Sequence, residues 1–244
     1  MVGDNAGATD SYDGGSGDNT LILSMTRAEW MRDDIQADLA AFLQFLTSEA
    51  PNANGQMSSK GFTFASLGLQ VRRVSNVEVL VDGVPQDPHD EAVVAVDDSA
   101  IAATEHSELT GDVTDNDLVP DLVRAVELVS GPAKGSLALE ADGTWRYDPG
   151  MAFDTLAQGE SETATFTYRV SDADRDSATA TVTLTINGTN DAPVAADDSG
   201  SADENEVLQV AVLDNDTDVD TSDTHTVTQV SIISGLGAVE VGWQ

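Results

Sequence analysis

The chain has 244 residues, 44 of them acidic and 10 basic, which gives a formal net charge of −34 at pH 7. This charge argues against nucleic-acid binding, which needs clustered Lys and Arg, and against anionic membrane surfaces, which attract basic segments. The absence of cysteine excludes disulfides, thiolate zinc sites and cysteine nucleophiles. We expect no membrane insertion, because no stretch approaches eighteen apolar residues. Residues 1–17 lack the pattern of a secretory signal peptide.

The N-terminal part predicts a flexible Gly/Asp-rich lead over residues 1–17 and a small α+β unit over residues 18–88. Residues 14–22 are close to the nonapeptide of calcium-binding β-rolls, but no second copy follows to stack on it. A glycine-rich lead into a strand is therefore favoured over a metal-binding turn. Short apolar runs predict the strands of the unit, at 21–25, 62–65, 67–74 and 77–81.

One helix is predicted in this unit. Thr26 and Glu29 have the spacing of a capping box, in which each side chain satisfies an amide of the first turn. From Met31 to Leu46, apolar residues recur at three- and four-residue steps and form one stripe. The other faces carry acids rather than Lys and Arg, so the stripe is expected to cover a sheet rather than a membrane surface.

From about residue 93 onward, short Val/Thr/Leu runs alternate with Gly, Asp, Asn and Pro turns, which predicts a β-sandwich over residues 93–193. The pair Asp142-Gly143 predicts a hairpin between strands at 136–139 and 144–147. Further strands are expected at 163–170 and 178–186. The predicted fold class is therefore mainly β, with a small α+β unit in front.

The chain then repeats itself with a period near one hundred residues, which indicates tandem domains. The sequence AVDDS at 95–99 returns as AADDS at 195–199, and an Asp-Asn-Asp triplet follows each time, at 115–117 and at 214–216. The second copy, over residues 194–244, contains only about half of the repeat. It is expected to be a truncation, a partly disordered half or a half that another chain completes.

The acidic residues are densest at the turns within and between these repeats. Asp214, Asp216, Asp218 and Asp220 alternate along one turn, and Asp172 and Asp174 do so after a strand. Alternating Asp in a loop can turn several oxygens to one point, and Ca²⁺ takes six to eight oxygen ligands. The alternative is that acidic turns are simply rich in Asp and Asn. We favour calcium, because so many adjacent like charges would otherwise oppose folding.

Two other divalent-cation sites fit less well. An EF-hand loop counted from Asp214 would place Val219 at the glycine position and His225 at the glutamate position. Magnesium keeps much of its water and needs only one or two carboxylates.

The motif Asn190-Asp191-Ala192-Pro193-Val194, with the paired-Asp motifs and the Asp142-Gly143-Thr144-Trp145 turn, resembles the VCBS-type cadherin-like repeat of bacterial secreted proteins. The resemblance covers residues 93–244 and implies a seven-strand Greek-key sandwich that binds calcium at domain junctions. One departure is Gly188, where cadherin linkers begin with Asp. With the alternating acids above, the implied ligands are Glu105, Asp115, Asp117, Asp172, Asp174, Asn190, Asp191, Glu204, Asp214, Asp216, Asp218 and Asp220.

Function follows from the same resemblance. Residues 18–88 also resemble regions that precede such repeats in type I-secreted, RTX-like calcium-binding proteins, which implies an extracellular or cell-surface location. Among small relatives, the rhizobial adhering proteins are calcium-dependent lectins for acidic exopolysaccharide. This comparison implies a monomeric, elongated adhesin with an extracellular polysaccharide partner in adhesion or a biofilm matrix. The alternative is a calcium-stiffened spacer of a large adhesin, without a glycan ligand.

Catalysis is not expected. The three histidines lie in linkers or acidic turns, and neither an HExxH motif nor a GxSxG nucleophile elbow occurs. Trp145 and Tyr147, two residues apart on one strand, could form a sugar platform. With so few aromatic residues in the chain, we expect them to fill the core of the sandwich instead.

Overall fold

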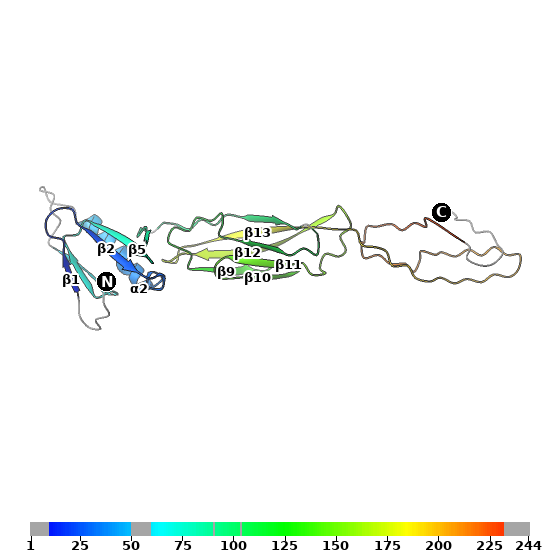
Figure 1. Ribbon diagram of the computed structural model, residues 1–244, viewed down its shortest axis with the longest axis horizontal. Coiled ribbons are helices and arrows are strands. Elements are labelled where there is room, and N and C mark those ends of the chain that lie inside the picture. The colour runs from blue at the N-terminus through cyan, green and yellow to red at the C-terminus, as the bar shows by residue number, and fades with distance from the viewer. Residues whose placement is uncertain (1–9, 50–59, 90, 103, 232–244) are drawn as a thin grey trace.

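The structure is a computed structural model that describes residues 10–49, 60–89, 91–102 and 104–231. Figure 1 shows three parts placed end to end as a rod. The N-terminal unit lies at one end, a β-sandwich forms the middle, and a C-terminal segment extends from the far end of the sandwich.

The N-terminal unit contains two three-stranded sheets and two helices. One sheet has the order β1-β4-β3 and the other the order β2-β5-β6. Buried residues alternate along the parallel strands β2 and β5, and their apolar face packs with α2 into one core. The strands are β1 (Asp10–Asp13), β2 (Thr20–Met25), β3 (Gly61–Phe64), β4 (Leu69–Arg72), β5 (Asn76–Val81) and β6 (Val84–Gln86).

The predicted single helix is wrong, because the structure divides it into α1 (Arg27–Trp30) and α2 (Asp33–Ser48). The capping box is present at α1, where Thr26 and Glu29 satisfy each other's amides. The chain leaves helical geometry at Arg32, whose backbone is extended with ψ of 128°. A new helix then begins at Asp33 and Asp34, acids that suit the positive end of the α2 dipole.

The lead into β2 also differs from expectation. Residues 10–13, assigned above to a flexible lead, form β1 and pair in parallel with β4. Gly15 and Gly17 then take positive φ, and the Asn19 side chain donates to the carbonyl oxygens of Gly17 and Arg73. The glycine-rich stretch therefore turns the chain from one sheet into the next, as the favoured interpretation of residues 14–22 requires.

The sandwich packs a three-stranded sheet, in the order β10-β11-β8, against a four-stranded sheet, in the order β7-β13-β12-β9. The pair Asp142-Gly143 turns the chain between β10 and β11, with Gly143 at φ of 100°. The seven strands are β7 (Asp98–Ile101), β8 (Leu109–Asp112), β9 (Ala125–Ser130), β10 (Ser136–Leu139), β11 (Thr144–Asp148), β12 (Ser161–Ser171) and β13 (Ser177–Asn187).

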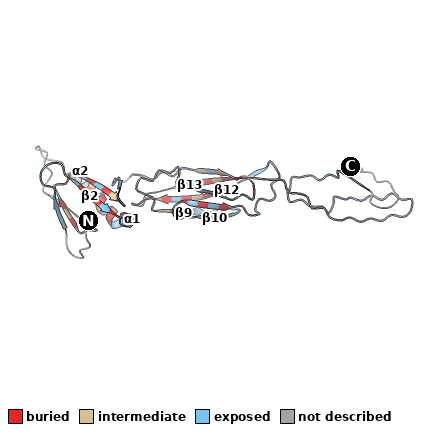
Figure 2. Cartoon of the chain, in the orientation of Figure 1, coloured by how far each residue is buried: buried red, intermediate tan, exposed pale blue. Residues whose placement is uncertain are grey.

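The core of the sandwich forms where the alternating apolar residues of both sheets meet. Trp145 and Tyr147 are buried in it, and the Trp145 ring lies edge-on to Phe166 with centroids 5.8 Å apart. The prediction that these two aromatic residues fill the core is confirmed. Figure 2 shows the alternation of buried and exposed residues along these strands, and the mainly β fold class is confirmed.

The C-terminal segment repeats the turns of the sandwich but leaves apolar residues exposed. The isolated bridge between Val94 and Leu118 recurs between Val194 and Thr217. Val113 is fully buried in the sandwich, whereas Val212, its counterpart one repeat later, is 42% exposed. Residues 232–244 of the predicted second repeat lie outside the described residues.

Candidate metal centres

Buried carboxylates lie at the two ends of the sandwich. Among the described residues, the buried polar or charged side chains are Glu105, Asp121, Asp172 and Asp220, each at most 3% exposed. A buried carboxylate costs free energy unless it is hydrogen-bonded, paired or bound to a metal. Each of the four therefore needs a partner that compensates the loss of water.

The first centre faces the N-terminal unit. Carboxylate oxygens of Asp121, Asp172 and Asp174 all lie within 4.8 Å of one another. Asp121 precedes β9, and the other two residues lie in the turn between β12 and β13. In the residues that the structure describes, no other set of three His, Cys, Asp or Glu side chains meets this criterion.

The electrostatics of this centre favour a cation. Both carboxylate oxygens of Asp172 are buried without a hydrogen-bond partner. Burial, and then the neighbouring Asp174, raise the pKa of Asp172 well above its usual range. A divalent ion would reverse this effect, because it stabilises the ionised carboxylates that crowd together here.

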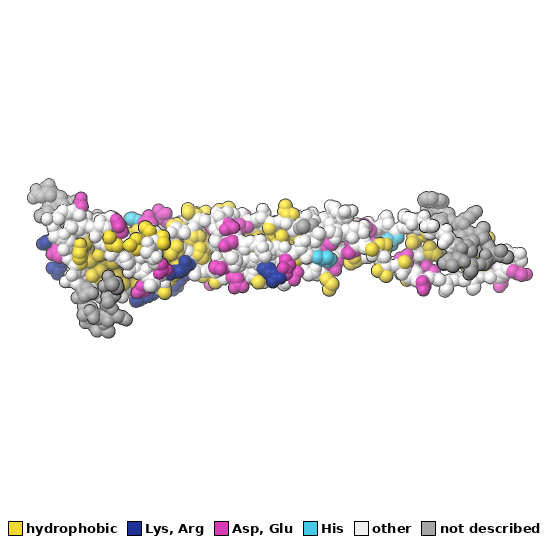
Figure 3. Space-filling model, viewed as in Figure 1, with side chains coloured by type: hydrophobic (Ala, Val, Ile, Leu, Met, Phe, Trp, Pro, Cys, Tyr) yellow, Lys and Arg dark blue, Asp and Glu magenta, His cyan; other side chains and the backbone are white. Residues whose placement is uncertain are grey.

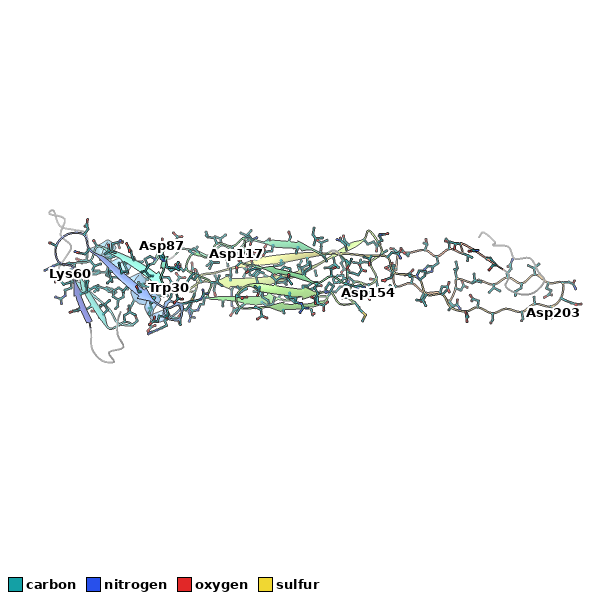
Figure 4. The ribbon with its side chains drawn as sticks, in the orientation of Figure 1. Trp30, Lys60, Asp87, Asp117, Asp154 and Asp203 are labelled. Carbon is teal, nitrogen blue, oxygen red and sulfur yellow. The ribbon has the colours of Figure 1, made fainter. Side chains whose placement is uncertain are left out.

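The second centre lies at the opposite end of the sandwich, where the C-terminal segment begins. Figure 4 places Trp30 near one end of the sandwich and Asp154 at the other. A cavity of about 540 Å³ at this junction is lined by Asp154, Asp191, Asp218 and His106. One oxygen each of Glu105, Asp154 and Asp220 is buried without a hydrogen-bond partner.

Hydrogen bonds hold the acids of the second centre in place. The Thr189 hydroxyl donates to Glu105, and the Asp191 amide donates to Asp220 over 2.8 Å. The Asp220 amide donates to Asp218 over 3.0 Å, and this bond, followed by that from His225, lowers the pKa of Asp218. These bonds occupy one side of each carboxylate and leave oxygens of Glu105 and Asp220 to bind a cation.

Gly188 is the first residue of the linker to the C-terminal segment, at the position where cadherin linkers begin with Asp. A Cβ atom at this position would lie 2.2 Å from the carbonyl oxygen of Leu156 and 2.5 Å from that of Ala157. The Gly188 amide donates to the carbonyl oxygen of Glu160 over 2.9 Å. The linker can therefore reach the second centre only if its first residue has no side chain.

The Asp-Asn-Asp triplets have a different place in the structure. The Val96 amide donates to Asp117 over 2.7 Å, and one repeat later the Ala196 amide donates to Asp216 over 2.9 Å. Asp117 also accepts a 3.0 Å hydrogen bond from Tyr168. These acids fasten the start of each repeat to its turn and are not among the acids gathered at either centre.

The remaining predicted ligands are placed as follows. Asp172 and Asp174 meet at the first centre, and Glu105, Asp191, Asp218 and Asp220 surround the second. Asn190 is exposed beside the second centre, and its side chain donates to the carbonyl of Asp191. Asp115, Asp214 and Glu204 are exposed, and their role in metal binding stays a prediction.

The predicted ligand set omitted two residues that the structure brings to these centres. Asp121 precedes Asp220 by 99 residues, so alignment of the two repeats would have found it. Asp154 lies in the loop between β11 and β12, which also contains Glu160, and no spacing in the sequence distinguishes it from other acids.

Carboxylate oxygens are ligands that Ca²⁺ prefers. Three carboxylates cluster at the first centre, and at each centre a buried carboxylate oxygen has no hydrogen-bond partner, from Asp172 at the first and from Asp220 at the second. The donors therefore fit calcium. In the described part of the chain, we find no helix with the length and apolarity needed to cross a membrane.

These features define a class of protein, a rod of β-sandwich repeats with acidic centres where its parts meet. Residues 84–188 match the family model of the bacterial cadherin-like domain, and residues 190–242 match that of the bacterial Ig domain. Together, the two matches identify the chain as a cadherin-like bacterial repeat protein.

Similarity to solved structures is distant. A SusE-like surface-located polysaccharide-binding protein from the heparin utilisation locus of Bacteroides thetaiotaomicron is 19% identical over 50% of this chain, with a TM-score of 0.30. An endo-fucoidan hydrolase of glycoside hydrolase family 107 is 19% identical over 48% of this chain, with a TM-score of 0.27. The chain spans 17% and 19% of their lengths. No curated protein matches the chain.

Proposed function

We propose that the chain is a secreted, non-catalytic calcium-binding protein in which calcium joins neighbouring modules of an adhesive rod. The observation that carries the proposal is the burial of Asp172 and Asp220 with unpaired oxygens at opposite ends of one sandwich. Asp172 belongs to the sandwich at its junction with the N-terminal unit, and Asp220 belongs to the C-terminal segment at its junction with the sandwich. An ion at each centre would therefore link two modules.

A different set of acidic residues would hold the ion at each centre. Asp121, Asp172 and Asp174 would hold an ion at the first centre, and Glu105, Asp154, Asp191, Asp218 and Asp220 at the second. Bound calcium supplies positive charge that offsets the mutual repulsion of these carboxylates. The backbone and hydroxyl donors described above fix the acids that the ion would contact.

Calorimetric titration with calcium tests this proposal directly. We expect Asp172→Asn to remove binding at the first centre and Asp220→Asn at the second, with the other centre retained in each variant. Asp203→Asn is the matched control, because Asp203 is exposed and lies at the far end of the C-terminal segment (Figure 4). Unchanged calcium binding in both centre variants would contradict the proposal.

For the partner, we propose an acidic extracellular polysaccharide that the protein binds as a calcium-dependent lectin. The resemblance to adhesin repeats supports this partner. The charge of −34 implies that an acidic polymer needs a bridging cation. The test is a glycan array probed in millimolar calcium and again with EDTA. Binding that is lost with EDTA would support a lectin, and binding that persists would contradict calcium bridging.

A spacer is the second candidate, and the burial of Trp145 and Tyr147 favours it. Sugar-binding surfaces commonly use exposed aromatic rings, and these two rings belong to the core. A spacer needs calcium only to fix the angle between modules. If the array shows no binding while calcium still binds by calorimetry, the spacer is the function.

A further inference from the structure

The first junction of the rod is sealed by apolar residues that the sandwich inserts into the N-terminal unit. Ala173, between the acids Asp172 and Asp174, is fully buried and belongs to the hydrophobic core of the N-terminal unit. Leu122, next to Asp121, packs against the same core and has a positive φ of 70°. The loops that carry the first metal centre are thus part of the neighbouring unit's core.

Polar contacts fasten the same junction. The Trp30 indole donates a 2.9 Å hydrogen bond to the carbonyl oxygen of Asp121. Asp33 accepts from Arg124 over 3.1 Å and from Arg175 over 2.8 Å, and the Arg27 guanidinium donates to the carbonyl oxygen of Val123. Figure 3 shows dark-blue Lys and Arg side chains gathered where the N-terminal unit meets the sandwich.

In the described residues, the second junction has no apolar insertion of this kind and fewer polar contacts. Neither hydrophobic core contains a residue beyond Ile186. No Lys or Arg follows Arg175 in the sequence, so the C-terminal segment brings no such cation to this junction. Thr221 donates its amide and hydroxyl to the carbonyl oxygen of Thr155, both over 3.4 Å. The charged side chains that the C-terminal side brings to the cavity at this junction are the carboxylates Asp191 and Asp218.

We infer that the two junctions respond differently to calcium. The first is a fixed joint that protein contacts keep docked when the ion is removed. The second is a hinge, whose carboxylates repel one another without an ion and which calcium closes. This inference rests on the proposed function, because calcium must bind at the second centre for that junction to close.

Spin-label distance measurements across each junction test the inference. The chain has no cysteine, so cysteines introduced in pairs are the only attachment points. Glu78→Cys with Thr165→Cys reports on the first junction, and Thr165→Cys with Ser201→Cys reports on the second. All three positions are exposed. Calcium titration of each labelled protein by calorimetry shows separately whether the ion binds.

With calcium, both distance distributions are expected to be narrow. With EDTA, the first should keep its width and the second should lose its narrow peak. A first distribution that broadens as much as the second would overturn the inference, and so would a second that stays narrow while calorimetry shows calcium binding. Absence of calcium binding in the unlabelled chain would instead refute the proposed function.

A pair of variants tests the contacts that hold the fixed joint. Asp33→Ala removes the acceptor of both Arg124 and Arg175, and the first junction is expected to broaden in EDTA. Asp34→Ala is the matched control, since Asp34 also lies in the first turn of α2 but pairs with Arg32 of the same unit. Equal widths for the two variants in EDTA would contradict the role given to Asp33.

Discussion

The indole nitrogen of Trp30 donates to the backbone carbonyl oxygen of Asp121, 91 residues later in the sequence. The bond joins α1 of the N-terminal unit to a residue of the first metal centre. Because Trp30 is 1% exposed, water cannot replace the donor if it is lost. This side chain therefore contributes both to the orientation of one module and to the geometry of a candidate ligand.

Trp30→Phe is expected to destabilise the N-terminal unit. The substitution keeps an aromatic ring and leaves a buried carbonyl oxygen without its donor, which costs about 1–3 kcal/mol. Chemical denaturation monitored by far-UV circular dichroism measures the change in the free energy of unfolding, because this signal does not rely on tryptophan fluorescence. Phe45→Leu, a change at a partly buried residue of the same core that donates no side-chain hydrogen bond, controls for altered packing. A Trp30→Phe midpoint equal to that of the natural chain would contradict the role of this bond.

Gly188→Ala should destabilise the sandwich at the second junction. The added methyl group would collide with the carbonyl oxygens of Leu156 and Ala157, and overpacking of this kind costs about 1–3 kcal/mol. Differential scanning calorimetry should show a lower Tm. Gly131→Ala is the control, because its added Cβ would meet only a side-chain carbon of Leu128, at 3.8 Å. A Tm loss of equal size in both variants would show that close approach at Gly188 is not the cause.

Asp98 should make the sandwich less stable as the pH rises. Burial, followed by nearby acids, raises the pKa of Asp98 from 3.8 to about 6. The folded chain therefore holds this proton more tightly than the unfolded chain. The stabilising contribution is complete below the unfolded pKa and is lost as the pH rises through about 6. Urea denaturation in EDTA across this range should show a flatter stability profile for Asp98→Asn.

Asp142 provides a control of opposite sign for that measurement. Hydrogen bonds from the Thr144 hydroxyl and amide lower the pKa of the exposed Asp142. Its contribution is present above the unfolded pKa and is lost as the pH falls through the lower, folded value. Asp142→Asn should therefore reduce stability near neutral pH and not in acid. The same slope change in both variants would contradict the assignment to Asp98.

Calcium should raise the thermal stability of the chain, because an ion that binds only the folded form shifts the unfolding equilibrium. At a free calcium concentration about 100-fold above Kd, one site adds about 2.7 kcal/mol. We expect the increase in Tm to be smaller in Asp172→Asn and in Asp220→Asn, and unchanged in Asp203→Asn. Equal Tm values with EDTA and with calcium in the natural chain would contradict calcium binding.

The sequence allowed four of the seven sandwich strands, at 136–139, 144–147, 163–170 and 178–186, and the Asp142-Gly143 hairpin to be predicted, because local turn chemistry and alternation determine them. The other three, β7, β8 and β9, were implied only by the seven-strand fold of the family that the chain resembles. The sequence did not predict the break between α1 and α2. The apolar stripe continues through Met31, whereas Trp30 is buried in the core of the N-terminal unit with its indole bonded to Asp121 of the sandwich. Helix periodicity contains no information about a contact 91 residues away.

The ligand set shows the same limit. Periodicity of the repeat drew attention to Asp117 and Asp216, yet each accepts a backbone amide of its own repeat. Asp154 belongs to the second centre only because the loop after β11, which carries this residue, lies at that end of the sandwich. Sequence spacing identifies acids that recur, whereas the fold determines which oxygens remain without a donor.

The exposure of Val212, whose counterpart Val113 is fully buried, affects how this chain behaves in solution. Apolar side chains open to water lower solubility and favour self-association. Backbone with few packed contacts is also the first to be cut by proteases. The purified protein is therefore expected to lose its C-terminal part during brief digestion with chymotrypsin or elastase. The fragment that remains should end near β13.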